Sequence, residues 1–450
     1  MLATEIILKT HLGHDICVVR SDFKWFGPSL PHSTVLAVLK FFNVSDRWVD
    51  FFRRALEAPT KFADEPIQVR KRGTPISGPL SDMLGETILF VLDFAFNQLT
   101  QGARLYRLHD DIWFWGEENT CIKGWEVMTE FTKIMGLEIN NDKTGSVRIA
   151  RKGEKVAPVL SKLPKGEVRW GFLKLDAATG RFLIDQNNVD KHIEELRCQL
   201  AACKSIFDWI QAWNNYGSRF FAVNFGKPAH CYGITHVDMM LDTFSRIQNK
   251  LFASTGGSVT STLKQMISER FGVKDIPEGY LYFPMSKGGL DLKSPFIDLY
   301  LIRDEFLETP DCTMDLFLKS EEAVYNAKKK AYENNGMLCM SNTNGVDTNK
   351  QLSGAEFMSL AEFIRYREQN SLEFQTAYIQ LTLQPEEFVI ESSNQLPELS
   401  SSVSPYEDWV IQLYAPDMLA RFGSLNIVEK GLLPTGMVRI LRESRFEWDG

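Results

Sequence analysis

The stretch RLHDDIWFWG, residues 107–116, decides the fold of this chain. Its adjacent aspartates, Asp110 and Asp111, interrupt two apolar segments, and this pattern predicts a pair of strands joined by a tight turn that begins at His109. A turn exposes both carboxylates while the packing of the strands fixes their position. Acidic pairs are common in structural turns, so this pair alone is weak evidence for catalysis.

A third carboxylate stands at the end of an earlier segment. The residues ICVVRSD, at positions 16–22, predict a buried strand that ends on Asp22. Carboxylates can hold two divalent ions about 3.5–4 Å apart, and these ions neutralise the attacking and leaving oxygens of a phosphoryl transfer. We therefore expect Asp22, Asp110 and Asp111 to meet at one edge of a sheet and to bind two ions, Mg²⁺ or Mn²⁺.

Helices and strands alternate around these carboxylates. The spacing of apolar residues predicts helices at residues 33–42, 45–56, 78–99 and 126–136. A hairpin is expected around residues 178–180, followed by mainly helical structure to about residue 271. The order strand, helices, strand pair, helix, strand is that of a split βαβ unit, in an α+β fold class. Phe114 is expected on one face of this sheet and Trp113 and Trp115 on the other, all in the core.

The composition is that of a folded protein, with 450 residues of which 44% are hydrophobic and 24% charged. No apolar run is long enough to cross a membrane, and the first residues lack a secretory signal. Seven scattered cysteines form no C-x-x-C pair, which indicates a reducing compartment and argues against structural zinc. His230, Cys231 and His236 are close in sequence but lack a fourth ligand. We expect an intracellular protein of the nucleus or cytoplasm, neither secreted nor bound to a membrane.

Charge is unevenly distributed along the chain. The formal net charge of −8 is unfavourable for binding phosphates. Residues 351–450 contain 15 acidic and 7 basic residues, so residues 1–350 are neutral as a whole. Basic clusters at residues 69–73 and 143–155 can line a channel for nucleic acid, although basic clusters are more often solvated surfaces.

Five stretches, in order and with suitable spacing, resemble the motifs of the reverse transcriptase family over residues 16–184. The matching positions are Asp22, Lys24, Phe26 and His32; residues 73–82 with Leu92 and Asp93; residues 108–111; Gly136, Leu137, Asn140, Lys143 and Thr144; and residues 170–175. Within the family, the chain is most similar in character to the single-copy cellular reverse-transcriptase-related proteins of fungi.

The resemblance implies a role for each group of residues. Asp22 and Asp110 would bind both metal ions, Asp111 would complete the set, and Lys143 would lie near the leaving pyrophosphate. The residues implied to contact the nucleotide and the template base are Phe26, Gly27, Gly73, Pro75, Ile76, Ser77 and Gly78. Those implied to grip the primer end are Trp170, Gly171, Phe172 and Leu173. A solvated lysine, an ordinary turn into a helix and a core hairpin are the structural alternatives for these stretches.

Four positions depart from the family pattern. Gly27 stands where the family has a bulky aromatic residue that excludes the ribose 2′-hydroxyl. Unless Phe26 takes that place, ribonucleotides are expected to be accepted. Ile76 replaces a glutamine and Asp82 a proline, which alters the contacts to the nucleotide, and Leu108 replaces an aromatic residue.

The expected architecture has four regions. They are a reverse-transcriptase-like palm at residues 1–166, a primer-grip hairpin with a helical thumb or connection at 167–333, a polar linker at 334–350 and an acidic helical region at 351–450. The fingers that family members carry before the palm are not found, so we expect a partner or a missing segment to supply them.

The expected reaction is the addition of nucleoside triphosphates to a primer 3′ end on an RNA or DNA template, by an RNA-directed DNA polymerase type of nucleotidyltransferase. The first alternative is a catalytically weak or inactive polymerase fold that binds RNA or protein. A phosphodiesterase that uses the same carboxylates is the second alternative, and the extra His or Asp cluster that it needs is not found in the sequence.

Overall fold

The computed structural model describes residues 1–74, 78–155, 158–159, 161–306, 309–335, 357–368, 371–388, 403–429 and 431–432. Three residues of the expected nucleotide loop, Pro75, Ile76 and Ser77, lie outside the described residues. Residues 336–350 of the expected linker lie outside them as well.

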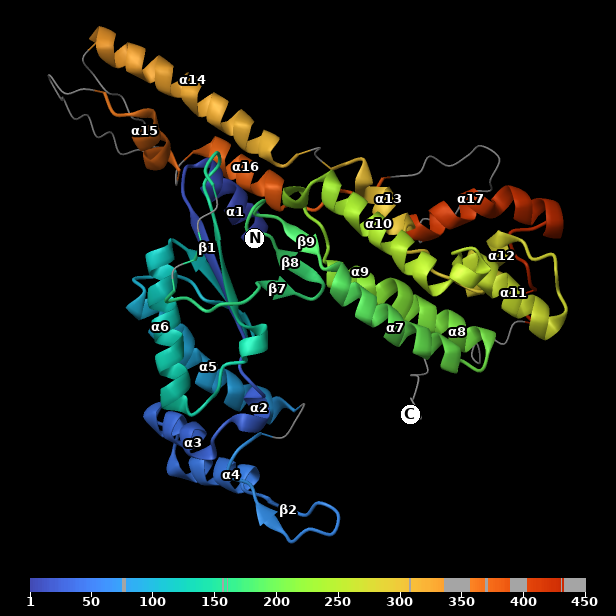
Figure 1. Ribbon diagram of the computed structural model, residues 1–450, viewed down its shortest axis with the longest axis horizontal. Helices are drawn as coiled ribbons and strands as arrows, with labels where there is room; N and C mark the ends of the chain where they lie inside the picture. The colour runs from blue at the N-terminus through green and yellow to red at the C-terminus, as the bar shows by residue number, and fades with distance from the viewer. Residues whose placement is uncertain are drawn as a thin grey trace.

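Four antiparallel strands form the main sheet (Figure 1). They are β1 (Ile16–Ser21), β4 (Tyr106–Leu108), β5 (Asp111–Gly116) and β6 (Gly145–Ile149). The order across the sheet is β4-β5-β1-β6, so the strand that leads to Asp22 is hydrogen-bonded to the strand that begins at Asp111. Every residue of β1 is buried, including Arg20 and Ser21, and its first four residues are apolar without alternation, as expected for a strand covered on both faces.

Helices α5 (Pro79–Leu99) and α6 (Glu118–Met135) pack against each other, and α6 packs on strands β1 and β5 (Figure 1). Successive side chains of β5 point to opposite faces, so Phe114 is buried beneath these helices and the tryptophans at its two sides face the other way. This division of the two faces confirms the prediction. Trp113 and Trp115 are only half-buried, however, because the second face of the sheet is incompletely covered at this end. Their expected place in the core is corrected accordingly.

A second sheet and the first helix cover the other face of the main sheet. The helix is α1 (Leu2–His11), and the strands are β7 (Arg169–Trp170), β8 (Leu173–Leu175) and β9 (Phe182–Ile184). The strands lie in the order β7-β8-β9 and are antiparallel. The turn between β8 and β9 passes through Gly180, which has the left-handed φ of 65° that glycine tolerates best. This is the hairpin predicted around residues 178–180.

The other described elements are mostly helices. Most of those after β9 extend away from the main sheet, whereas the helices Asp311–Asn335 and Leu372–Thr382 return to pack against α1 (Figure 1). Those between β1 and α5 are α2 (Phe26–Ser29), α3 (His32–Phe41), α4 (Asp46–Leu56) and the short strands β2 (Pro59–Thr60) and β3 (Gln68–Val69). Those after β9 are α7 (Gln186–Ala202), α8 (Ile206–Ala212), the π-helical turn η2 (Trp213–Arg219), α9 (Phe220–Phe225), α10 (Ile234–Leu251), α11 (Val259–Phe271), α12 (Glu278–Tyr282), α13 (Ile297–Arg303), α14 (Asp311–Asn335), α15 (Leu360–Arg367), α16 (Leu372–Thr382) and α17 (Pro405–Phe422). None of the described helices combines the length and the apolar character needed to span a membrane.

The α+β fold class is confirmed by this mixture of helices and small antiparallel sheets. Three of the helices predicted from apolar spacing are observed close to their expected bounds, as α3, α4 and α5. Helix α6 begins earlier than predicted and ends at Gly136, whose φ of 70° closes the helix in the left-handed conformation. Strand β4 is shorter than predicted because only Tyr106 to Leu108 pair with β5 at the edge of the sheet.

Candidate active site

Asp22 follows directly after β1 and is held by its main chain. Its carbonyl oxygen accepts a hydrogen bond from the amide of Asn140 at 2.8 Å, and the next residue, Phe23, forms a bridge to Ile139. The side chain of Asp22 is almost fully buried, with 4% of its surface exposed. The carboxylate therefore has a fixed position at the end of the strand.

Asp110 lies in the turn between β4 and β5, after His109, whose φ of 52° makes the turn tight. Its carboxyl is within hydrogen-bonding reach of the Asp22 carboxyl. Burial raises the pKa of Asp110, and the negative charges of Asp22 and then Asp111 raise it further. Two carboxyls from distant parts of the sequence thus meet at one edge of the main sheet.

Lys143 completes this contact from a third segment. Its amino nitrogen lies 2.7 Å from Oδ2 of Asp22, and about half of the lysine side chain is exposed. The hydrogen bond to Asp22 raises the pKa of Lys143 above its ordinary value, so the amino group is protonated at neutral pH. The helical turn at Asn141–Lys143 sets this position, because β6 starts two residues later beside β1.

Asp111 forms an ion pair with Arg20. Nη2 of Arg20 lies 2.7 Å from Oδ1 of Asp111, and Nη1 donates a hydrogen bond of 3.2 Å to the carbonyl of Lys143. The guanidinium also lies 5.9 Å from the centre of the Trp113 ring. Among the described residues, no three or more His, Cys, Asp or Glu side chains are arranged to hold a metal ion.

Sequence reasoning missed Arg20, although a signal for it exists. Arg20 stands two residues before Asp22, so the two side chains point to the same face of the sheet. The register pairs Arg20 with Trp113, which likewise lies two residues from Asp111. Alternation on two neighbouring strands therefore brings the arginine and the third carboxylate to one face.

The loop that precedes α5 packs against the segment after β1. Gly73 has a φ of 87°, and a Cβ there would lie 2.8 Å from the carbonyl oxygen of Pro28, so only glycine fits. Nε2 of His32 donates a 2.8 Å hydrogen bond to the Gly73 carbonyl, so this buried histidine fixes the loop to the start of α3. Gly78 caps the start of α5. Thus Gly73 packs against α2, the helix that begins four residues after Asp22.

Phe26 and Gly27, expected near the nucleotide, begin helix α2. The Phe26 ring is buried and stacks on Phe23 at 5.6 Å between ring centres. It also lies against Gly85 of α5, where an added Cβ would be 3.1 Å from the ring. Phe26 is therefore part of the core beneath the sheet, while an added Cβ at Gly27 would make only an ordinary 3.6 Å contact with Thr74.

Of the four expected primer-grip residues, Trp170 and Gly171 are exposed, and Phe172 and Leu173 are buried. Trp170 is 41% exposed, and its ring centre lies 6.2 Å from that of Trp113. Phe172 is buried and stacks on Phe221 at 5.3 Å, and Leu173 is buried beside it. Gly171, with a φ of 55°, leaves no room for a Cβ, which would lie 2.8 Å from the side-chain oxygen of Asn224.

A cavity of about 320 Å³ lies between the main sheet and the β7–β9 sheet, beside Asp111. We call it the aromatic pocket, and its ring-bearing walls include Tyr106, Trp113, Trp115, Trp170 and Tyr232. Trp115 stacks on Tyr106 with ring centres 4.3 Å apart and planes 7° from parallel. This pocket could not be predicted from the sequence, because it forms only where the two sheets meet.

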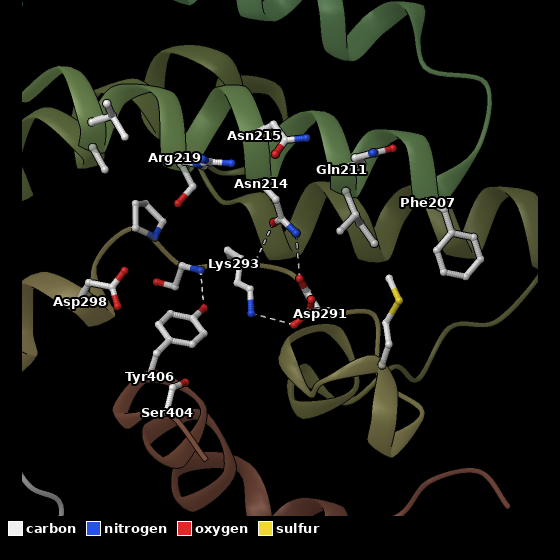
Figure 2. Close-up of a pocket in the computed structure, with 17 residues that line it drawn as sticks. Phe207, Gln211, Asn214, Asn215, Arg219, Asp291, Lys293, Asp298, Ser404 and Tyr406 are labelled. Carbon is white, nitrogen blue, oxygen red and sulfur yellow. Dashed lines mark hydrogen bonds and ion pairs between the residues drawn. The ribbon is translucent and has the colours of Figure 1, made fainter. Parts of the chain in front are cut away.

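A larger cavity of about 510 Å³ lies in the helical region, away from the predicted site residues (Figure 2). We call it the helical-region cavity. The side chain of Asn214, on the π-helical turn, donates to the carbonyl of Asp291 at 2.9 Å and accepts from the amide of Lys293 at 2.8 Å. Lys293 pairs with the Asp291 carboxylate at 2.8 Å and lies 4.9 Å from the centre of the Tyr406 ring. This network ties η2, the loop before α13 and the start of α17 together.

Comparisons with known proteins add little. Neither a scan against protein-family models nor a search of curated proteins finds a match. Among solved structures, apo telomerase from Candida tropicalis, truncated from its C-terminal domain, is 16% identical over 41% of this chain and 38% of that chain, with a TM-score of 0.30. Telomerase from Candida albicans with the TWJ fragment of telomeric RNA is 10% identical over 60% of this chain and 49% of that one, with a TM-score of 0.31. The chain thus spans less than half of these telomerases, and the superposition is too loose to support a function.

Proposed function

We propose that the chain adds nucleotides to a primer 3′ end on a nucleic-acid template. The catalytic centre would be the group of Asp22, Asp110, Asp111 and Lys143, which we call the acidic site. The observation that carries this proposal is the contact between Asp22 and Asp110, carboxyls from different strands, with Lys143 beside them. The strand order β4-β5-β1-β6, with α5 and α6 on one face, is also compatible with a polymerase palm of the split βαβ type.

Divalent ions fit part of this site. Two carboxyls in contact repel each other when both are ionised, and a cation bound between them relieves that repulsion. Asp111 does not fit as a ligand while Arg20 holds its carboxylate. Asp22 and Asp110 would therefore hold Mg²⁺ or Mn²⁺, and a second ion would require Arg20 to release Asp111. When bound, such ions supply positive charge to the attacking oxygen and the leaving pyrophosphate.

Lys143 has the properties of a group that assists the leaving pyrophosphate. Its amino group is protonated at neutral pH, the hydrogen bond to Asp22 raises its pKa further, and about half of its side chain is exposed. A protonated amine near the leaving oxygen can donate a proton or stabilise the developing charge. With the Asp22 carboxylate engaged by a divalent ion, Lys143 would be released for this role.

The surroundings of Asp22 favour acceptance of ribonucleotides. Phe26 is buried against Phe23 and α5, and Gly27 carries no side chain, so neither supplies a ring to exclude a 2′-hydroxyl. We expect primer extension with NTPs within about tenfold of that with dNTPs, because no ring excludes the 2′-hydroxyl. Such a steric contact would supply roughly 1–3 kcal/mol of discrimination, or about 5- to 150-fold. Parallel assays with the two nucleotide sets test this, and rejection of NTPs by a thousandfold would contradict it.

A binding module without turnover is the second candidate function. Arg20 neutralises Asp111 and Lys143 neutralises Asp22, so the site is largely balanced by its own side chains. A balanced site needs no metal ion to be stable, which suits a protein that holds RNA through other surfaces.

Primer extension with Mg²⁺ or Mn²⁺ separates the two candidates. We expect incorporation by the wild-type chain and a loss of at least about a thousandfold in Asp110→Asn, because the charge that holds the ion is removed. Asp142→Asn is the matched control, since Asp142 is exposed one residue from Lys143. Equal and absent incorporation in wild type and Asp110→Asn, with RNA still bound, would support the binding module instead.

A further inference from the structure

The aromatic pocket has walls suited to a flat, apolar ligand. Trp115 and Tyr106 form one nearly parallel stack, and Trp113 and Trp170 meet at an angle of 65° across the gap between the two sheets. Trp170 keeps 41% of its surface exposed, so an aromatic face that would be more stable out of water remains open. A planar ring inserted against these walls would cover that face.

We infer that the aromatic pocket binds one unpaired nucleobase of a single-stranded nucleic acid. Every base has a π-face, and stacking on aromatic side chains tolerates any base sequence. Asp111 also lines this pocket, so a base held there lies beside the acidic site where the proposed function requires a nucleic-acid strand. The inference rests on the proposed function only in taking nucleic acid as the ligand, and it does not require turnover.

The size of the aromatic pocket favours a single base over a base pair. Its volume of about 320 Å³ is at the lower end of the range of small-molecule pockets, and it is bounded by the main sheet on one side and β7 on the other. Trp113 and Trp170 are in edge-to-face contact, with ring centres 6.2 Å apart, so a base would stack on the open face of Trp170 and not between the two rings. A base of a single strand has a free face for this contact, whereas a paired base in a duplex is already stacked on its neighbours.

The positions of the rings are fixed by the fold, which reduces the loss of entropy on binding. Trp113 lies on a paired strand and contacts the guanidinium of Arg20, and that arginine is itself held by Asp111. Trp170 is paired with Leu173 in the β7–β8 hairpin. The hairpin is anchored by Phe172, which is buried and stacks on Phe221. Preorganised walls lose few side-chain rotamers when the ligand arrives.

The test compares two labelled oligonucleotides of equal length by fluorescence anisotropy. One is an oligothymidylate and the other carries the same phosphates on abasic sugars, so the two differ only in the presence of the bases. Wild type should bind the oligothymidylate about 5- to 100-fold more tightly, the range expected for one stacked base. Trp170→Ala should abolish this preference, while Trp170→Phe should keep most of it.

Trp48→Ala is the matched control. Trp48 on α4 is 54% exposed and stacks on Phe52, so it is an equally accessible tryptophan outside the aromatic pocket, and its loss should leave the preference unchanged. Equal affinity of wild type for the two oligonucleotides, tighter binding of duplex than of single strand, or an unchanged preference in Trp170→Ala would each overturn the inference.

The same variants distinguish this inference from the proposed function. Asp110→Asn should lose primer extension and still prefer the oligothymidylate. If extension depends on Asp110 but the preference survives in Trp170→Ala, only the inference fails. If the preference depends on Trp170 and no variant or wild type extends a primer, only the catalytic proposal fails.

Discussion

The acidic site and the helical-region cavity both contain carboxylates and basic side chains, yet they use them differently. In the helical-region cavity, Lys293 forms an ion pair with Asp291 (Figure 2). The side chain of Asn214 hydrogen-bonds to the carbonyl of Asp291 and to the amide of Lys293. In the acidic site, the carboxyls of Asp22 and Asp110 are in contact. Burial and the charge of Asp22 raise the pKa of Asp110. In the helical-region cavity, Asp291 and Lys293 neutralise each other. In the acidic site, Lys143 and Arg20 pair with two of the three carboxylates, and the remaining repulsion falls on Asp110.

The difference indicates where a ligand adds most stability. A buried polar network whose donors and acceptors are already paired gains little from a bound ion and loses free energy when any member is removed. A pair of like charges is stabilised by a bound cation. Replacing one of the two charged residues is therefore expected to reduce function more than it reduces the stability of the fold. The larger cavity is therefore the weaker candidate for the chemistry.

The largest expected contrast is in catalysis. Asp22→Asn should lower primer extension by about a thousandfold or more, because the buried carboxylate that binds the ion loses its charge. Asp298→Asn, which changes a carboxyl in the wall of the helical-region cavity, should alter it by less than about twofold. A comparable loss in both variants, measured under identical primer-extension conditions, would erase the distinction between the two regions.

The free energy of unfolding, in contrast, should depend on the hydrogen-bond network of the helical-region cavity. Asn214→Ala leaves the Asp291 carbonyl and the Lys293 amide without their partner, and we expect it to lower the free energy of unfolding by about 2–4 kcal/mol. Asn215→Ala, an exposed neighbour on the same π-helical turn, should change it by less than about 0.5 kcal/mol. Urea denaturation measures both, and equal values would mean that the network does not hold these segments together.

Acid should weaken the packed core next to the β7–β9 sheet through His236. Burial lowers the pKa of this histidine from 6.5 to about 4 in the folded chain. The folded state therefore disfavours the charged ring, and the stability that is fully present above pH 6.5 falls as the pH drops toward 4. Between pH 7.5 and 5 the loss should be about 2 kcal/mol, and it should be absent in His236→Gln. Thermal unfolding of both proteins across this range measures it, and parallel curves would refute the role of His236.

The smallest expected effect concerns the third carboxylate. Arg20→Gln removes the guanidinium from Asp111, so Mn²⁺ binding followed by electron paramagnetic resonance should tighten by about tenfold, or 1.4 kcal/mol. Arg148→Gln is the control, because Arg148 pairs with Asp15 near the other end of β1. Unchanged Mn²⁺ affinity in Arg20→Gln would mean that Asp111 takes no part in the site.

Local patterns were sufficient to predict much of the fold. The apolar run before Asp22, the acidic turn and the apolar spacing of α3, α4 and α5 are properties of short segments, so strands and helices follow from the residues within them. The left-handed Gly136 at the end of α6 is predictable for the same reason. The contact of Asp22 with Asp110 was a hypothesis from motif order, and the pairing of β1 with β5 is what brings the two together.

Sequence alone determined which residues form the strands and the acidic turn, since those depend on neighbours in the chain. Only the tertiary structure decided that Arg20 binds Asp111, that Phe172 and Leu173 are buried, and that Trp113 and Trp170 form a pocket. These outcomes depend on the register between strands and on the approach of two sheets. Both are set by packing between segments far apart in the sequence, and no local pattern encodes them.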